Sequence, residues 1–121
     1  MSEFNNELYL ASRKNSNTVA VCPITTAGAS SIYETSLTGG DAGISATTYD
    51  GKLYLAYKNT ANDDLIMAET TGGITFAIHE YSNMQINGSQ NIAPPTTVFN
   101  GLFYLVMTAN NSGHDMYLTQ N

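Results

Sequence analysis

Residues 49–56 read YDGKLYLA, an aromatic residue and an Asp-Gly pair followed by a run of apolar and aromatic residues. The stretch returns in two further versions, FNNELYLA at 4–11 and FNGLFYLV at 99–106. The copies begin at residues 4, 49 and 99, so they are spaced by 45 and 50 residues. Repeats of this period are typical of propeller blades, solenoid turns and arrays, whose units bury their faces against one another. The chain carries about two and a half copies of such a unit.

The similarity between copies extends well past the opening motif. Residues 25–28 (TTAG) match residues 70–73 (TTGG), and residues 32–36 (IYETS) match residues 78–82 (IHEYS). His79 therefore stands at the position that Tyr33 has in the first copy. Each repeat is a whole supersecondary unit rather than a recurring short phrase.

The middle copy predicts four short strands. The β-branched and aromatic segments that carry them are residues 44–49, 52–58, 65–70 and 74–81. Asp50-Gly51 and Gly72-Gly73 supply tight turns between them, because glycine tolerates positive φ. No segment shows a sustained helical period with caps, so we expect almost no helix.

The strand over residues 52–58 has two apolar faces. In an extended chain Leu53, Leu55 and Tyr57 lie on one side, and Tyr54 and Ala56 lie on the other. A strand without a polar face is expected between two sheets. Four antiparallel strands in about 45–50 residues match the size of a propeller blade. We therefore predict an all-β fold of four-stranded antiparallel β-propeller blades.

The copies divide the chain into a partial blade (4–43), a full blade (44–92) and a partial blade (93–121). The first copy is expected to begin with the strand over 7–13, and the third to end with a strand over 115–121. Incomplete blades leave open sheet edges, which favour pairing with another chain. We therefore expect a homo-oligomer, a dimer or larger. Two chains would supply about five repeats, within the four to eight blades of most propellers.

Composition limits the partners of the chain. Of its 121 residues 42% are hydrophobic, which is typical of a globular protein, but charged residues make up only 12% and the net charge is −6. The four basic residues are Arg13, Lys14, Lys52 and Lys58, too few to neutralise the phosphates of a nucleic acid or to bind an anionic membrane. A surface rich in Asn, Thr, Ser and Gly suits neutral polar ligands.

The ends and interior of the sequence carry no targeting signal that we recognise. The N-terminal residues lack a basic segment followed by an apolar core, so we expect no secretory signal, and a cytoplasmic location or non-classical release. No apolar stretch approaches the 18 residues of a spanning helix, so membrane insertion is not expected. Cys22 is the single cysteine and lies in an apolar run, which is typical of a small buried side chain.

The aromatic-Asn/Asp-Gly-x-Leu-Tyr-Leu-Ala motif and the later Gly-Gly-x-Thr-Phe turn resemble the repeats of sialidase-like β-propellers, and in particular of propeller lectins. The signature turn of that family is the Asp-box, Ser-x-Asp-x-Gly-x-Thr-Trp. Residues 69–76 read ETTGGITF, in which Gly73 and Thr75 match, Phe76 replaces the Trp and Thr71 replaces the Asp. The resemblance implies a propeller of stacked blades. Catalysis in the resembling sialidases requires three arginines, and this chain has one, Arg13, so we do not expect sialidase activity.

Motifs for other enzymes are missing from the sequence. There is no Gly-x-Ser-x-Gly nucleophile elbow, and no glycine-rich phosphate loop opening a helix. The two histidines, His79 and His114, fall short of a zinc site. The acidic groups at residues 62–64 and at Asp41 lack the spacing of a calcium loop, so we expect them in turns or strand caps. We expect no enzyme, no cofactor and no metal.

Carbohydrate binding is the function that the composition favours. A sugar ring stacks on an aromatic face while Asn, Asp and Thr side chains bind its hydroxyls. Three tyrosines fall near predicted strand ends, and a polar loop follows residues 52–58. The candidate ligand-binding residues are therefore Tyr57, Asn59, Asp63, Asp64, Tyr81 and Tyr117.

Two alternatives remain open at this stage. The chain is predicted to be a non-enzymatic, multivalent, lectin-like propeller module whose partners are copies of itself and glycans. A structural or protein-interaction propeller would have the same repeats. So would an engineered or truncated propeller fragment that self-assembles.

Overall fold

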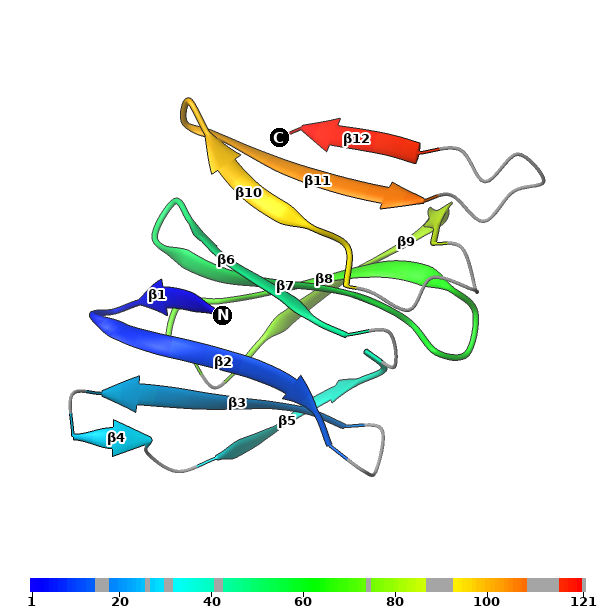
Figure 1. Ribbon diagram of the computed structural model, residues 1–121. Helices are drawn as coiled ribbons and strands as arrows, with labels where there is room; N and C mark the ends of the chain where they lie inside the picture. Colours follow the sequence, from blue (N-terminus) through cyan, green and yellow to red (C-terminus); the bar gives the residue numbers. More distant parts are fainter. Residues whose placement is uncertain are drawn as a thin grey trace.

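The computed structural model describes residues 1–14, 18–25, 27–29, 32–40, 43–73, 75–86, 93–108 and 116–120. Over these residues the chain forms twelve β-strands and no helix, so the predicted all-β class is confirmed. The strands form three antiparallel sheets that follow one another along the chain. Figure 1 shows the three sheets one above another, with the second between the first and the third.

The strands of each sheet follow chain order with little exception. The first sheet contains β1 (Ser2–Phe4), β2 (Glu7–Arg13), β3 (Thr18–Thr25), β4 (Gly28–Ala29) and β5 (Tyr33–Thr38). The second sheet contains β6 (Ser45–Tyr49), β7 (Lys52–Lys58), β8 (Asp64–Thr70) and β9 (Ala77–Gln85). The third sheet contains β10 (Thr96–Phe99), β11 (Leu102–Thr108) and β12 (Met116–Gln120).

The first sheet corrects the prediction that the first copy begins at its second strand. Ser2–Phe4 forms β1 and pairs antiparallel with β2. The connection is a tight turn in which Asn5 and Asn6 have φ of 51° and 61°, a backbone that asparagine adopts more readily than most residues. The same turn recurs at Asp50-Gly51 and at Asn100-Gly101. The sequence analysis missed β1 because this strand is only three residues long.

The fourth place in the first sheet is divided between two strands. Both β4 and β5 pair with β3, β4 opposite Ile24 and Thr25, and β5 opposite the part of β3 that begins at Thr18. In the second sheet the single strand β9 takes this place beside β8. Its bounds differ from the predicted 74–81, whereas β7 has the predicted bounds of residues 52–58.

We call the side of a sheet that points toward the next sheet along the chain its forward face, and the opposite side its backward face. The forward face of the first sheet packs on the backward face of the second to form one core cluster. Its buried members are Phe4, Tyr9, Val19, Val21 and Leu37 from the first sheet, and Leu53, Leu55, Tyr57, Ile66 and Ala68 from the second.

A second core cluster forms in the same way between the second and third sheets. Its buried members are Ala56, Leu65 and Ile86 on one side and Phe103, Leu105 and Met107 on the other. Tyr49, Tyr54 and Met67 pack against it from the second sheet. The predicted division of the 52–58 strand is therefore confirmed, with Leu53, Leu55 and Tyr57 in one cluster and Ala56 in the other.

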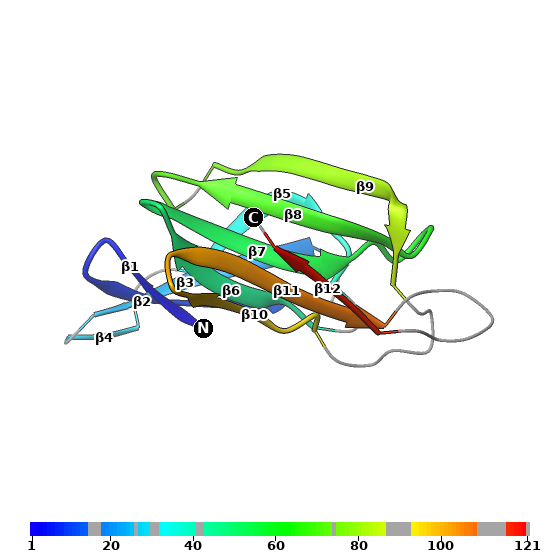
Figure 2. The ribbon, with the colours of Figure 1, turned by 90° about the horizontal axis from the view of Figure 1, so that it is seen from above.

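The first strands of the three sheets are joined by hydroxyl groups. Ser2 in β1 and Thr48 in β6 share a hydrogen bond of 2.9 Å between their side-chain oxygens, and Thr47 in β6 and Thr96 in β10 share one of 2.6 Å. The contacts between sheets gather on these strands and on β2 and β7 beside them. In the view from above, β6 and β10 lie close together on one side of the molecule and β9 lies on the other (Figure 2).

The turn between β8 and β9 closes over the first core cluster. The Thr70 hydroxyl accepts hydrogen bonds from the backbone N–H groups of Gly72 and Gly73, at 3.2 and 2.9 Å. Gly73 has a φ of 91°, and a β-carbon there would lie 2.4 Å from the hydroxyl oxygen of Tyr9. The close approach of Tyr9 thus requires glycine at position 73.

Gly73→Ala is expected to lower the free energy of unfolding by about 2–4 kcal/mol, because it adds left-handed backbone strain to overpacking against Tyr9. Gly72→Ala is the matched control, since a β-carbon at Gly72 meets no atom within 4 Å. We expect Gly72→Ala to change the free energy of unfolding by less than about 0.5 kcal/mol. Equilibrium denaturant unfolding measures both variants, and equal losses would contradict the packing of Tyr9 on Gly73.

Candidate functional site

A groove of about 380 Å³ opens between the second and third sheets. Its volume lies within the range of roughly 300–1,000 Å³ that is typical of small-molecule sites. Strands β6, β7, β8, β9 and β11 all contribute to its walls. The lining residues are Tyr49, Tyr54, Leu65, Met67, Glu69, His79, Tyr81, Met84, Phe103 and Leu105.

Three of the residues that line the groove, Tyr49, Tyr54 and Phe103, form an aromatic cluster. The ring centroids of Tyr54 and Phe103 are 5.4 Å apart, those of Tyr49 and Phe103 5.7 Å, and those of Tyr49 and Tyr54 6.3 Å. The Tyr49 hydroxyl donates a hydrogen bond of 3.1 Å to the carbonyl oxygen of Gly101. The cluster therefore ties the turn of the third sheet to the second sheet and presents aromatic surface to the groove.

Polar groups lie beside the aromatic cluster. Glu69 Oε1 lies 2.9 Å from His79 Nε2, and Glu69 Oε2 lies 2.9 Å from Lys52 Nζ. The hydrogen bond from Lys52, and after it that of His79, holds the pKa of Glu69 below its ordinary value. The same partner, Glu69, raises the pKa of Lys52. The lowered pKa favours the ionised carboxylate of Glu69, which accepts hydrogen bonds in the wall of the groove.

The polar pair has no counterpart in the first repeat. In the first sheet Pro23 lies opposite Tyr9 and Tyr33 lies opposite Val21. In the second sheet the register places Glu69 opposite Tyr54 and His79 opposite Met67. The structure therefore confirms the alignment of His79 with Tyr33, and it places a carboxylate and an imidazole where the first repeat has a proline and a tyrosine.

The two intersheet spaces are closed differently. At the first, the Gly73 turn lies on Tyr9, and Phe76 packs against the core cluster. Tyr9 is only 6% exposed there. At the second, Tyr54 has the position equivalent to Tyr9 and lines the groove.

Two of the tyrosines predicted from the sequence occupy opposite environments. Tyr81 in β9 is 39% exposed and lines the groove. Tyr57 near the end of β7 is fully buried in the first core cluster, and burial raises its pKa to about 12. Its ring has no exposed face on which a sugar could stack, which corrects the prediction of Tyr57 as a ligand-binding residue. The reason is the alternation of β7, which directs Tyr57 to the same side as Leu53 and Leu55.

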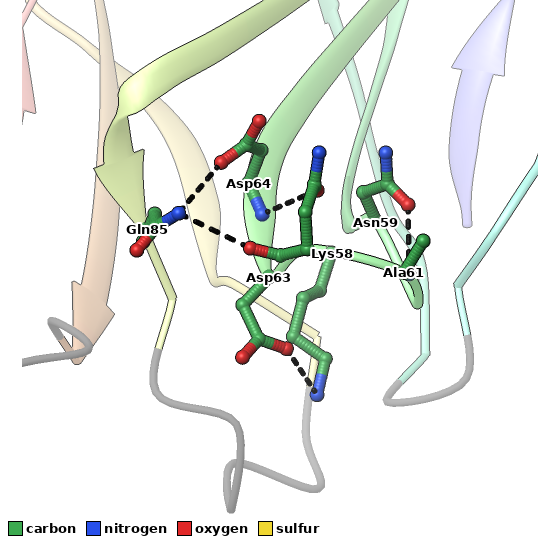
Figure 3. A network of polar contacts seen from close by, with 7 residues as sticks. Lys58, Asn59, Ala61, Asp63, Asp64 and Gln85 are labelled. Carbon is green, nitrogen blue, oxygen red and sulfur yellow. Dashed lines mark hydrogen bonds and ion pairs between the residues drawn. The ribbon is translucent and has the colours of Figure 1, made fainter.

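The predicted residues Asn59, Asp63 and Asp64 are brought together in the turn between β7 and β8 (Figure 3). Asn59 Oδ1 accepts a hydrogen bond of 2.9 Å from the backbone N–H of Ala61. Asp63 adopts a φ of 63° and lies 3.8 Å from Lys58 Nζ. These contacts build the turn, in agreement with the capping role that the sequence favoured for residues 62–64.

Asp64 is, with Lys58, one of the two buried members of this network. It is buried and accepts a hydrogen bond of 3.1 Å from Gln85 Nε2, which also donates to the Asn62 carbonyl oxygen at 3.2 Å. Glu80 lies on the outer side, where hydrogen bonds from Asn62 and Asn59 lower its pKa. The network joins the end of β9 to the β7–β8 turn and does not include a groove-lining residue.

The remaining candidates are placed by backbone or lie outside the described residues. Tyr117 lies in β12, opposite Met107 of β11. His114 and Asp41 lie outside the described residues. Among the residues that are described, no cluster of three or more His, Cys, Asp or Glu side chains is arranged to hold a metal ion. Within the same ranges, no helix has the length and apolarity needed to cross a membrane.

Sequence reasoning missed most of the groove. It named neither Tyr49 nor Tyr54 as a binding residue, and it gave His79 no role beyond its alignment with Tyr33. The signal that could have located the groove is the departure from the repeat at two positions, Glu69 for Pro23 and His79 for Tyr33. Polar residues at positions that are otherwise apolar or aromatic indicate a local requirement beyond packing.

Comparison with known proteins adds no relative to this description. No protein-family model matches the chain, and no curated protein or solved structure matches it.

Glu69→Gln is expected to destabilise the protein at neutral pH and to lose this effect in acid. The folded pKa of Glu69 lies below the ordinary value of 4.5, so its stabilisation is complete above that pH and is lost as the pH falls through the folded pKa. Denaturant midpoints of wild type and variant, measured from neutral pH to about pH 3, should therefore converge.

A Lys52→Met background provides the control for this titration, because it removes the largest cause of the lowered pKa. The difference between Glu and Gln at position 69 should be smaller there and less dependent on pH. An unchanged pH dependence in that background would contradict the assignment of Lys52 as the main partner.

Proposed function

We propose that the chain is a non-enzymatic carbohydrate-binding module of β-propeller blades, and that the groove between the second and third sheets is its sugar site. The observation that carries the proposal is the combination of aromatic surface, formed by Tyr49, Tyr54 and Phe103, with the hydrogen-bonding pair Glu69 and His79 in one groove. Two observations support the propeller form. The antiparallel units repeat along the chain, and their first strands, β1, β6 and β10, are joined to one another by hydroxyl hydrogen bonds.

The chemistry of the groove suits a neutral sugar. A pyranose has apolar C–H faces that stack on aromatic rings, and hydroxyl groups that require donors and acceptors. The carboxylate of Glu69 accepts hydrogen bonds, while the His79 ring, whose side chain is 54% exposed, has a nitrogen for either role. Tyr81 adds an exposed ring at the β9 side of the groove. A strongly charged ligand would find no matching excess of charge here, because Lys52 already offsets Glu69.

The same residues argue against glycoside hydrolysis. That reaction uses two carboxyl groups across the scissile bond, one of them with a raised pKa to act as general acid. Among the described residues that line the groove, Glu69 is the single carboxylate, and its pKa is lowered rather than raised. Binding without turnover is the function that this donor set supports.

Titration with a panel of neutral mono- and disaccharides at millimolar concentration, followed by ligand-observed NMR, tests the proposal. At least one sugar should bind, and Tyr81→Ala should weaken that sugar about tenfold, the loss of one stacking contact of roughly 1–1.5 kcal/mol. The exposure of Tyr81 makes this change tolerable to the fold.

Tyr33→Ala is the matched control for this experiment. Tyr33 is 36% exposed at the first intersheet rim and stands where His79 stands in the second repeat, but it does not line the groove. Its removal should leave sugar affinity unchanged. Absence of binding by every sugar, or equal losses in the two variants, would refute the groove as a sugar site. Capture of a protein partner unaffected by sugars would instead support the structural alternative.

A further inference from the structure

The two intersheet interfaces of this chain are versions of one interface. In each, a forward face with an aromatic pair meets a backward face of large apolar side chains. The aromatic pair is Phe4 and Tyr9 in the first sheet and Tyr49 and Tyr54 in the second. The facing residues are Leu53 and Leu55 in the first interface and Phe103 and Leu105 in the second, at equivalent positions of the repeat.

The forward face of the third sheet carries the next version of the aromatic half. Phe99 stands at the repeat position of Phe4 and Tyr49, and Tyr104 at that of Tyr9 and Tyr54. Thr96 bonds to Thr47 of the second sheet, so alternation along β10 directs Phe99 away from that sheet. Phe99 is 63% exposed. Among the described residues no further sheet packs on this forward face.

The backward face of the first sheet carries the other half of this interface. Leu8 and Leu10 stand at the repeat positions of Leu53 and Leu55, and they are 37% and 39% exposed where their counterparts are fully buried. Cys22 pairs with Leu10 and Ile24 with Leu8 across β2 and β3, so these residues extend the same half-buried apolar surface. The two ends of the stack therefore expose the two complementary halves of the interface that occurs twice inside it.

We propose that the forward face of the third sheet of one copy docks on the backward face of the first sheet of a second copy, which repeats the internal interface between chains. The partner is a second copy of this chain because each exposed half matches the half presented at the opposite end of the stack. Such a contact is head-to-tail, with two different patches on each protomer. It generates a closed ring where the rotation between sheets closes, and a longer assembly where it does not.

The contact also accounts for side chains that are costly to leave in water. Burying a leucine or phenylalanine side chain stabilises an assembly by roughly 1.5–3 kcal/mol. Phe99 is among the most exposed large hydrophobic residues described, and Leu8 and Leu10 face solvent from adjacent positions on one side of β2. The proposal is independent of the sugar site, because the groove is built within a single copy.

Size-exclusion chromatography with light scattering on the full chain and two variants tests this contact. Wild type should form an assembly of several copies at micromolar concentration. Leu10→Asp, on the backward face of the first sheet, and Phe99→Asp, on the forward face of the third, should each give folded monomers, as judged by circular dichroism. Ile78→Asp is the control, because Ile78 is 50% exposed on β9 of the middle sheet and belongs to neither end face. It should keep the wild-type mass.

Mixing the two charged variants decides the geometry. The Leu10→Asp copy retains an intact third-sheet face and the Phe99→Asp copy retains an intact first-sheet face, so an equimolar mixture should form a one-to-one dimer and nothing larger. A dimer also shows that both variants are folded. Wild type that is monomeric throughout, or a mixture that stays monomeric, would overturn the head-to-tail contact. Sugar titration of the monomeric variants would show whether the groove binds sugar in a single copy, so a failure of the head-to-tail contact can be told from a failure of the sugar site.

Discussion

Everything in this molecule depends on covering both faces of the second sheet. Strand β7 has leucines and a tyrosine on one side and an alanine and a tyrosine on the other, and neither side can face water without a large loss of hydrophobic stabilisation. The first and third sheets supply the two covers. Because the first and third sheets are copies of the same unit, each of them has an outer apolar face that must be covered in turn.

The hydroxyl contacts between first strands set how the sheets stack. Ser2, Thr47, Thr48 and Thr96 join β1, β6 and β10 across the stack, so the sheets are held together along one side. Packing farther from these strands depends on what each turn and side chain can reach. At the first interface the Gly73 turn and Phe76 close over Tyr9, while at the second the space beside Tyr54 forms the groove. A ligand-sized hollow thus arises from the same repeat that elsewhere gives a closed core.

Much of the fold could be predicted from the sequence, since strand alternation and glycine- or asparagine-containing turns are local properties. The sequence indicated the bounds of β7, the turn at Asp50-Gly51 and the opposite directions of Leu53 and Tyr54. It failed at β1, because a three-residue strand carries too little pattern, and at the site residue Tyr57, because a position near a strand end does not reveal exposure. Of the two predicted tyrosines whose side chains the structure describes, Tyr81 lies in the groove wall and Tyr57 is buried.

The sequence by itself determined that this chain is built of repeated antiparallel units with two apolar faces. Side chains alternate with a period of two residues within each strand, and the motif recurs after 45 and 50 residues, so both patterns can be read from the sequence. The tertiary structure alone decided which faces meet, where the groove opens, that Glu69 and His79 share it and that Lys52 pairs with Glu69. Those outcomes depend on the register between strands and on the distances between sheets. Both are long-range properties, and residues far apart in the chain settle them together.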